Sequence, residues 1–114
     1  MRIKLVTEPT KNRYPAKVTA VMEGSNMYGK YLHLKFTITE GDLFSWTFSG
    51  FVKPVPINGS KFYSWMVNIL GEVSEADFFT EDLIGKECII ELDKHKKIYV
   101  VKDVFPKTRD KIML

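Results

Sequence analysis

Ring-bearing and basic side chains alternate with apolar ones in residues 28–36, YGKYLHLKF. Successive side chains of a β-strand point to opposite faces, so a strand here turns its leucines to one side and Tyr31, His33 and Lys35 to the other. Aromatic rings stack on nucleobases at about 1–3 kcal/mol each, and lysines neutralise phosphates. The outward set therefore combines the two kinds of group that a surface for single-stranded nucleic acid needs.

More basic and aromatic residues lie before this strand and in a later turn. Residues 23–30, EGSNMYGK, have the composition of an exposed loop, too long for a tight hairpin, and residues 94–97, KHKK, are densely basic. Each candidate also has a structural interpretation: the tyrosines cover a rim, His33 pairs with a neighbouring side chain, and the lysines solvate a turn. The candidate nucleic-acid contacts are Lys17, Tyr28, Lys30, Tyr31, His33, Lys35, Lys94, Lys96 and Lys97.

The net charge of +3 is unevenly distributed along the chain. Residues 1–35 carry seven Lys or Arg and two Asp or Glu, residues 36–93 carry three and ten, and residues 94–114 carry seven and two. If the fold brings the first and last strands together, the two basic ends form one positive face, as expected of a protein that binds a polyanion. The alternative is ordinary solvated charge.

Length and composition predict one globular domain. The 114 residues are 45% hydrophobic and 27% charged, near the average for folded domains. The chain has neither an apolar run long enough for a membrane span nor the apolar stretch of a signal peptide near its start. The lone Cys88 agrees with a reducing compartment, so a cytoplasmic protein is expected. One cysteine and two separated histidines do not have zinc-ligand spacing, and no metal or cofactor is expected.

The first half of the chain has the period-two pattern of β-strands. Residues 14–22, YPAKVTAVM, predict a strand with Val18 and Ala20 inward and Val21 outward. Residues 31–39 predict the second strand. Residues 1–13 have little periodicity and are expected to form an arm or a short extra strand.

A third strand is predicted at residues 43–51, LFSWTFSGF, after a short hairpin turn at residues 40–42. Its alternation turns Phe44 and Phe48 into the core. By the same parity Trp46 belongs in the core, although a bulge in this strand would reverse it. The outward side chains of this strand are Ser45, Thr47 and Ser49.

The period then changes to that of a helix. Five apolar side chains fall on one stripe, with Ser60 as a suitable N-cap and Gly71 as a suitable terminator: Phe62, Trp65, Met66, Ile69 and Leu70. The acidic residues 71–86 predict a loop with one helical turn, in which Phe78, Phe79, Leu83 and Ile84 pack against the body of the protein. Strands are predicted at residues 87–93 and 98–105.

Three antiparallel strands, a helix and a final hairpin are the element order of an OB-fold, a five-stranded Greek-key β-barrel with the helix between strands three and four. An SH3-like barrel does not normally have a full helix at that point. The predicted organisation is an N-terminal arm at 1–13, an OB-fold domain at 14–106 and a C-terminal tail at 107–114. In OB-folds, single strands lie on the exposed face of strands two and three, flanked by the loops that follow strands one and four.

Several segments, in this order, resemble small OB-fold proteins of bacteriophages and mobile elements: YPAKVTAV, YGKYLHLKFTI, KFYSWMVNILG, DLIGKECIIEL and KIYVVKDVFP. The resemblance spans most of the chain and implies a single-stranded DNA-binding or replication-associated role. Its motifs mainly specify the fold. The chain departs from bacterial housekeeping single-strand binding proteins at its end, PKTRDKIML, which is basic and apolar where those proteins have an acidic tail that recruits partners.

Two functions remain open. The first is a sequence-tolerant module for single-stranded nucleic acid, with DNA favoured, that serves phage or plasmid replication or recombination and assembles with itself or a replication protein. The second is a protein-interaction OB domain, whose apolar rim docks a partner: Phe51, Val52, Val55, Phe78 and Phe79. The chain has no glycine-rich phosphate loop, nucleophile elbow or metal-binding cluster, so an enzyme is not expected.

Overall fold

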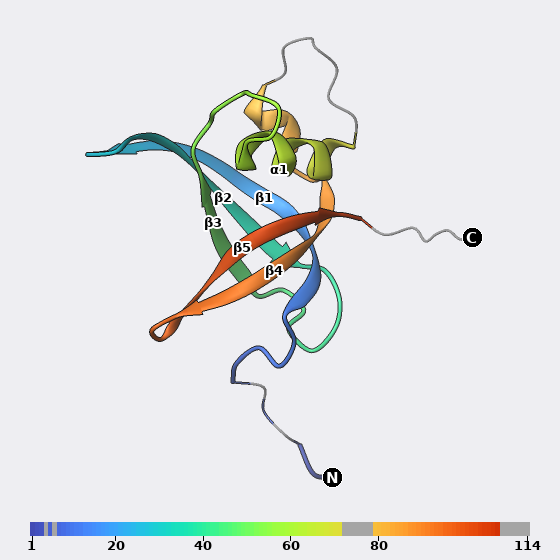
Figure 1. The fold of residues 1–114 in the computed structure, drawn as a ribbon. Coiled ribbons are helices and arrows are strands. Elements are labelled where there is room, and N and C mark those ends of the chain that lie inside the picture. The colour runs from blue at the N-terminus through green and yellow to red at the C-terminus, as the bar shows by residue number, and fades with distance from the viewer. Residues whose placement is uncertain (4, 6, 72–78, 108–114) are drawn as a thin grey trace.

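The computed structural model describes residues 1–3, 5, 7–71 and 79–107 of the chain. These residues form one antiparallel sheet, one α-helix and one short 3₁₀-helix (Figure 1). In chain order the elements are β1 (Arg13–Asn26), β2 (Gly29–Ile38), β3 (Thr47–Val52), α1 (Lys61–Leu70), η1 (Thr80–Leu83), β4 (Glu87–His95) and β5 (Ile98–Pro106).

The five strands pair in the order β3-β2-β1-β4-β5. β1 is shared between two parts of the sheet, because its first residues pair with β4 and its longer remainder pairs with β2. In Figure 1 the β4–β5 hairpin crosses over the β1–β2–β3 part, and α1 covers one end. No pairing joins the edge strands β3 and β5 in the described residues, so the sheet is open and the closed barrel stays a prediction.

β1 contains a bulge that overturns the predicted inward and outward sets beyond Val18. The register with β2 shifts between Val18 and Ala20. As a result Val21 pairs with Leu34 and packs against the core, whereas Ala20 pairs with the exposed Lys35. The prediction that Ala20 points inward and Val21 outward is therefore wrong, because an extra residue in one strand reverses the side-chain parity that follows it.

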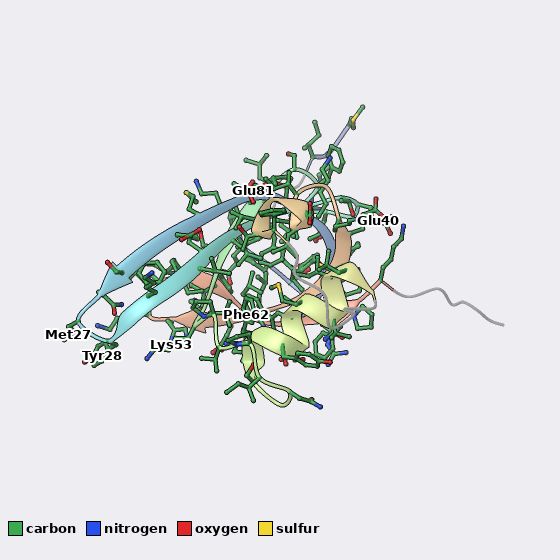
Figure 2. The ribbon with its side chains drawn as sticks, turned by 90° about the horizontal axis from the view of Figure 1, so that it is seen from above. Met27, Tyr28, Glu40, Lys53, Phe62 and Glu81 are labelled. Atoms are coloured by element: carbon green, nitrogen blue, oxygen red, sulfur yellow. The ribbon has the colours of Figure 1, made fainter. Side chains whose placement is uncertain are left out.

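β1 and β2 form a long hairpin, which corrects the exposed loop predicted at residues 23–30. Asn26 pairs with Gly29, so only Met27 and Tyr28 form the turn. Gly29 has φ 112°, a conformation that glycine adopts without steric cost. Figure 2 shows Met27 and Tyr28 at the tip of a hairpin that projects from the body of the protein.

The connection between β2 and β3 is longer than the predicted hairpin turn at residues 40–42, and β3 begins at Thr47 rather than at residue 43. Leu43 is fully buried, but Phe44 is 64% exposed, so the prediction that Phe44 lies in the core is wrong. Trp46 is half-buried and packs against the core, on the predicted side, although it lies in the connection rather than in the strand.

The helix follows the sequence prediction closely. The Ser60 side chain accepts a hydrogen bond from the Tyr63 backbone N–H at 3.0 Å, and the N–H of Gly71 donates to the Val67 carbonyl at 2.8 Å. These caps satisfy backbone groups that the ends of a helix leave unpaired. Four residues of the apolar stripe are buried and Leu70 is half-buried, and Trp65 meets Phe36 edge-on with ring centroids 6.1 Å apart.

The core lies between the sheet and α1 and includes the fully buried Cys88. Burial is the main cause that raises the pKa of the Cys88 thiol to about 12. In the acidic connection the single helical turn is present as η1, and its Leu83 is buried. Phe79 and Ile84 are exposed, contrary to the predicted packing, and Phe78 lies outside the described residues.

The N-terminal segment is held against the body without forming a strand in its described residues. The backbone N–H groups of Thr10 and Lys11 both donate to the Tyr14 hydroxyl at 3.0 Å, and the Tyr99 hydroxyl donates to Glu8 at 3.3 Å. Of the predicted tail, only Lys107 is described. No helix in the described part of the chain has the length and apolar character needed to cross a bilayer.

Candidate nucleic-acid interface

Three rings meet on the outward side of β2 and β3. His33 pairs with Phe51 across the two strands, and their rings stack with centroids 4.4 Å apart and planes at 24°. The Tyr31 ring meets Phe51 edge-on at 5.9 Å. Phe51 remains 47% exposed, although a ring of this kind is usually buried. We call the outward surface of β1, β2 and β3 the ring face.

A glycine in β1 makes room for the Tyr31 ring. Gly24 pairs with Tyr31 across the hairpin, and a Cβ added at Gly24 would lie 2.5 Å from the Tyr31 hydroxyl oxygen and ring. The tyrosine therefore lies flat across the backbone of β1 instead of extending into solvent. Any side chain at position 24 would displace this ring.

His33 is fixed by a polar neighbour as well as by Phe51. Its Nε2 and the Ser49 Oγ are 2.7 Å apart, in a hydrogen bond between β2 and β3. Burial, and secondarily the positive charge of Lys35, lower the pKa of His33 below its usual value of 6.5. The imidazole is therefore neutral at neutral pH, which suits a ring that stacks more than one that pairs with an anion.

Lysines border the rings. Lys35 is exposed beside Ser49 in the register, and Lys30 lies at the end of the β1–β2 hairpin. Lys53 follows β3 and donates through Nζ to the Tyr28 carbonyl at 2.9 Å. Among the described residues, none of these three lysines forms an ion pair. Their charges are therefore not neutralised by neighbouring carboxylates.

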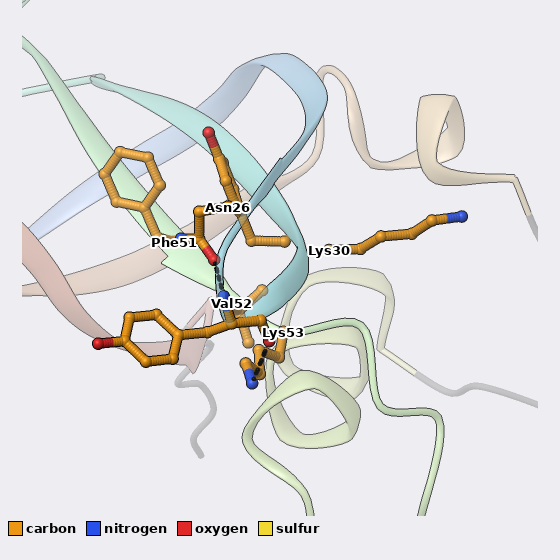
Figure 3. A pocket seen from close by; sticks show the side chains of 7 residues that line it. Asn26, Lys30, Phe51, Val52 and Lys53 are labelled. Atoms are coloured by element: carbon orange, nitrogen blue, oxygen red, sulfur yellow. Dashed lines mark hydrogen bonds between the residues drawn. The ribbon is translucent and has the colours of Figure 1, made fainter.

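An open pocket of ≈ 500 Å³ lies between the Tyr31 and Phe51 rings and the end of the β1–β2 hairpin (Figure 3). Asn26 shapes its wall, because its Oδ1 accepts a hydrogen bond from the Tyr28 backbone N–H at 2.8 Å. The pocket has the mixture of aromatic and basic groups that a nucleotide requires. Its lining residues are Asn26, Tyr28, Lys30, Tyr31, Phe51, Val52 and Lys53.

Lys17 lies at the opposite end of the ring face. It pairs with Thr37 of β2 on one side and with Glu87 of β4 on the other. Glu87 also forms an ion pair with Lys107. A hydrogen bond from Lys107 and its charge, with a smaller effect from Lys17, lower the pKa of Glu87 below 4.5. This corner therefore holds two cations and one carboxylate.

The lysine-rich turn forms the tip of the β4–β5 hairpin. Lys96 and Lys97 are its two turn residues, and Lys96 has φ 60°. The Lys94 ammonium lies 5.5 Å from the centre of the Tyr99 ring, and His95 contacts Asp93 at 3.2 Å. In Figures 1 and 2 this tip and the tip of the β1–β2 hairpin project toward the same side.

The structure thus brings some predicted contacts together and separates others. Tyr31, His33 and Lys35 share the ring face, and Tyr28 and Lys30 line the pocket at its edge. In the described residues no hydrogen bond or ion pair joins the residues of the lysine-rich turn to the ring face. Their shared concave surface therefore stays a prediction.

Phe51 and Lys53 line this site, although the sequence pattern did not predict them as nucleic-acid contacts. A signal for Phe51 existed, because it continues the outward parity of Thr47 and Ser49. Lys53 follows the strand, and only the hairpin's position brings it to the pocket. Val52, expected on an apolar docking rim, is buried.

The described residues include no group of three or more His, Cys, Asp or Glu side chains that could hold a metal ion. No protein-family model matches this sequence, and no curated protein matches it. The function therefore has to be argued from the chemistry of the site.

Proposed function

We propose that this protein is a sequence-tolerant module of the OB-fold class that binds single-stranded nucleic acid, with DNA favoured. The observation that carries the proposal is the group of three contacting rings on the outward surface of β2 and β3, with Phe51 nearly half exposed and unpaired lysines beside it. Every nucleobase has a π-face, so a platform of rings binds single strands without reading sequence.

The topology supports the OB-fold class. β1 pairs with both β2 and β4, the helix falls between β3 and β4, and the edge strands β3 and β5 lie near each other without pairing. An OB-fold is a partly open five-stranded barrel that binds on the face of strands two and three. The rings lie on that face.

Electrostatics supports a polyanionic ligand. All outward side chains of β1, β2 and β3 on the ring face are neutral or basic, from Lys17 and Thr37 at one end to Tyr31 at the other. Glu23 of β1 falls on the opposite parity, where it pairs with Leu32. A phosphate backbone laid along β2 would therefore meet Lys35 without an adjacent carboxylate, and beside Lys17 it would meet a carboxylate, Glu87, that already pairs with Lys107.

Protein docking is the second candidate, because apolar side chains outside the ring face are exposed: Ile57 is 62% and Phe79 is 75% exposed. Salt distinguishes the two functions. Affinity for a phosphate backbone falls steeply with salt, whereas an apolar contact changes little.

The test is fluorescence anisotropy with a labelled oligo-dT of about a dozen nucleotides, titrated at several salt concentrations. We expect micromolar or tighter binding in low salt. Tyr31→Ala should weaken it about fivefold or more through loss of stacking. Removing the charges of Lys94, Lys96 and Lys97 together should reduce the slope of log K against log salt by about 2.

Lys61→Gln is the matched control, because Lys61 is exposed on α1, outside both hairpin tips and the ring face. It should leave the slope unchanged. A flat titration of the wild-type protein in low salt would exclude the proposed function, and salt-independent binding of a partner protein would favour docking.

A further inference from the structure

Another exposed ring lies at the far end of the ring face, away from Phe51 and Tyr28. Phe44, in the connection between β2 and β3, is 64% exposed and lines an open pocket of ≈ 320 Å³ together with Lys17, Thr37 and Ser45. Nothing in the sequence pattern predicted this position, because alternation assigned Phe44 to the core. The pocket combines one aromatic ring, one cation, hydroxyl groups and one carboxylate, Glu87.

The connection holds Phe44 outward through its backbone. The N–H of Phe44 donates to the Gly41 carbonyl at 3.2 Å, and the N–H of Ser45 donates to the Ile38 carbonyl at 2.9 Å. Ser45 has φ 74°, a left-handed conformation that residues with a side chain rarely adopt. Fully buried Leu43 anchors the same turn in the core. The ring is therefore presented by a fixed turn rather than by a free loop.

A continuous polar path leads from the three rings to Phe44. It crosses Lys35 and a row of threonine hydroxyls, in which Thr37 is 3.1 Å from Thr19 and 3.0 Å from Thr47. From Tyr31 to Thr37, β2 advances six residues, which is about 20 Å at the rise of an antiparallel strand. About six nucleotides cover that length at 3.4 Å each, and fewer do so where the strand is extended.

The pocket beside Phe44 includes a carboxylate whose charge two lysines offset. Glu87 lines the same pocket, but Lys107 pairs with it and Lys17 lies next to it in the register. Two ammonium groups therefore offset one carboxylate. A phosphate placed at the pocket is therefore attracted by the two lysines more than it is repelled by the single carboxylate.

We propose that Phe44 is a second base-stacking site for the same single strand, with Lys17 as the phosphate contact beside it. This inference rests on the proposed function and makes it more specific. Short oligonucleotides occupy the three rings alone, whereas longer ones also reach Phe44. The bound strand follows β2 along its length instead of crossing it.

The experiment compares dT4 and dT12 binding for the wild-type protein, Phe44→Ala and Phe44→Leu. Phe79→Ala is the matched control, because Phe79 is a phenylalanine of similar exposure outside the ring face. Both Phe44 variants should weaken dT12 binding at least about fivefold and change dT4 binding less than about twofold. Phe79→Ala should change neither, and thermal melting confirms that each variant is folded.

Equal dT12 affinities for Phe44→Ala, Phe44→Leu and Phe79→Ala would overturn the second stacking site, and wild-type binding of dT12 would still support the proposed function. Equal losses for dT4 and dT12 would also overturn it, because Phe44 would then belong to the first site. Failure of the wild-type protein to bind dT12 would instead overturn the proposed function itself.

Discussion

The outward surface of β1, β2 and β3 and the outward surface of β4 and β5 differ in whether their charged side chains form ion pairs. On the ring face, Lys35 has no carboxylate neighbour within its strands, and the side chains around it are rings and hydroxyls. On the outward surface of β4 and β5, which we call the ion-pair face, Glu91 contacts Arg13 at 3.3 Å and Lys102 at 3.7 Å. One surface leaves its cations available, and the other neutralises them internally.

The aromatic residues differ in the same way. The Arg13 guanidinium lies over Phe105 on the ion-pair face, 4.0 Å from its ring centre, whereas Phe51 on the ring face contacts His33 and Tyr31 and is still nearly half exposed. The guanidinium occupies one face of Phe105, and Phe105 is also less exposed than Phe51, so it offers less ring surface to a base. Both faces contain similar residue types, so the proposed function depends on which charges and rings the fold leaves without a partner.

The largest expected effect is the loss of the open ring. Phe51→Ala should weaken oligo-dT binding by about 5- to 150-fold, because it removes a stacking contact and loosens His33. Phe105→Ala is the counterpart on the ion-pair face and should change the affinity less than about twofold. Anisotropy titrations of both variants, normalised to folded protein by thermal melting, measure the difference. Similar losses of affinity in both variants would contradict the proposed difference between the ring face and the ion-pair face.

Charge removal should have the next largest effect. Lys35→Gln should reduce the slope of log K against log salt by about 0.7, the value for one phosphate contact on a single strand. Lys102→Gln removes the same charge from a pair with Glu91 and should leave the slope unchanged. A salt series with each variant tests this, and an equal slope change for the two lysines would argue against a localised site.

The pKa of His33 should report on the surroundings of its ring and on oligo-dT binding at the ring face. Its pKa is lowered, so the folded state binds this proton more weakly than the unfolded state. The corresponding stability is present above pH 6.5 and is lost as the pH falls through the folded pKa. The NMR titration midpoint of the His33 ring should lie below 6.5 and rise when oligo-dT supplies a counter-anion to Lys35. A midpoint above 6.5 in the free protein would contradict the geometry.

The smallest effect is expected on the ion-pair face. Glu91→Gln removes the carboxylate from Arg13 and Lys102, whose side chains are both more than half exposed. Pairs between exposed cations and a partly exposed carboxylate contribute little, so the free energy of unfolding should fall by about 1 kcal/mol or less in urea titrations. Oligo-dT affinity should not decrease. A drop in affinity would show that the ion-pair face takes part in binding.

Local patterns predicted the elements well. The stripe from Phe62 to Leu70, with Ser60 and Gly71 at its ends, places α1 within a residue, because a helix is built from contacts three and four residues apart. The alternation in β2 correctly places Leu34 in the core, and the ends of β4 and β5 differ from the prediction by one or two residues.

The site was harder to predict, because it depends on pairing between strands. The bulge before Ala20 exchanges the faces of Ala20 and Val21, and neither side chain has a property that would predict the bulge. The two-residue turn at Met27 brings Tyr28 to Lys53 only because β1 and β2 remain paired to their ends. The outward position of Phe44 likewise follows from the backbone bonds of its turn.

The sequence by itself determined the order of strands and helix, the buried stripe of α1 and the outward direction of Tyr31, His33 and Lys35, since each depends on a short-range period. Tertiary structure decided that Phe51 stacks on His33, that Gly24 makes room for Tyr31, and that the cations of the ion-pair face are already paired. Those contacts join residues far apart in the chain, and register fixes which of them meet.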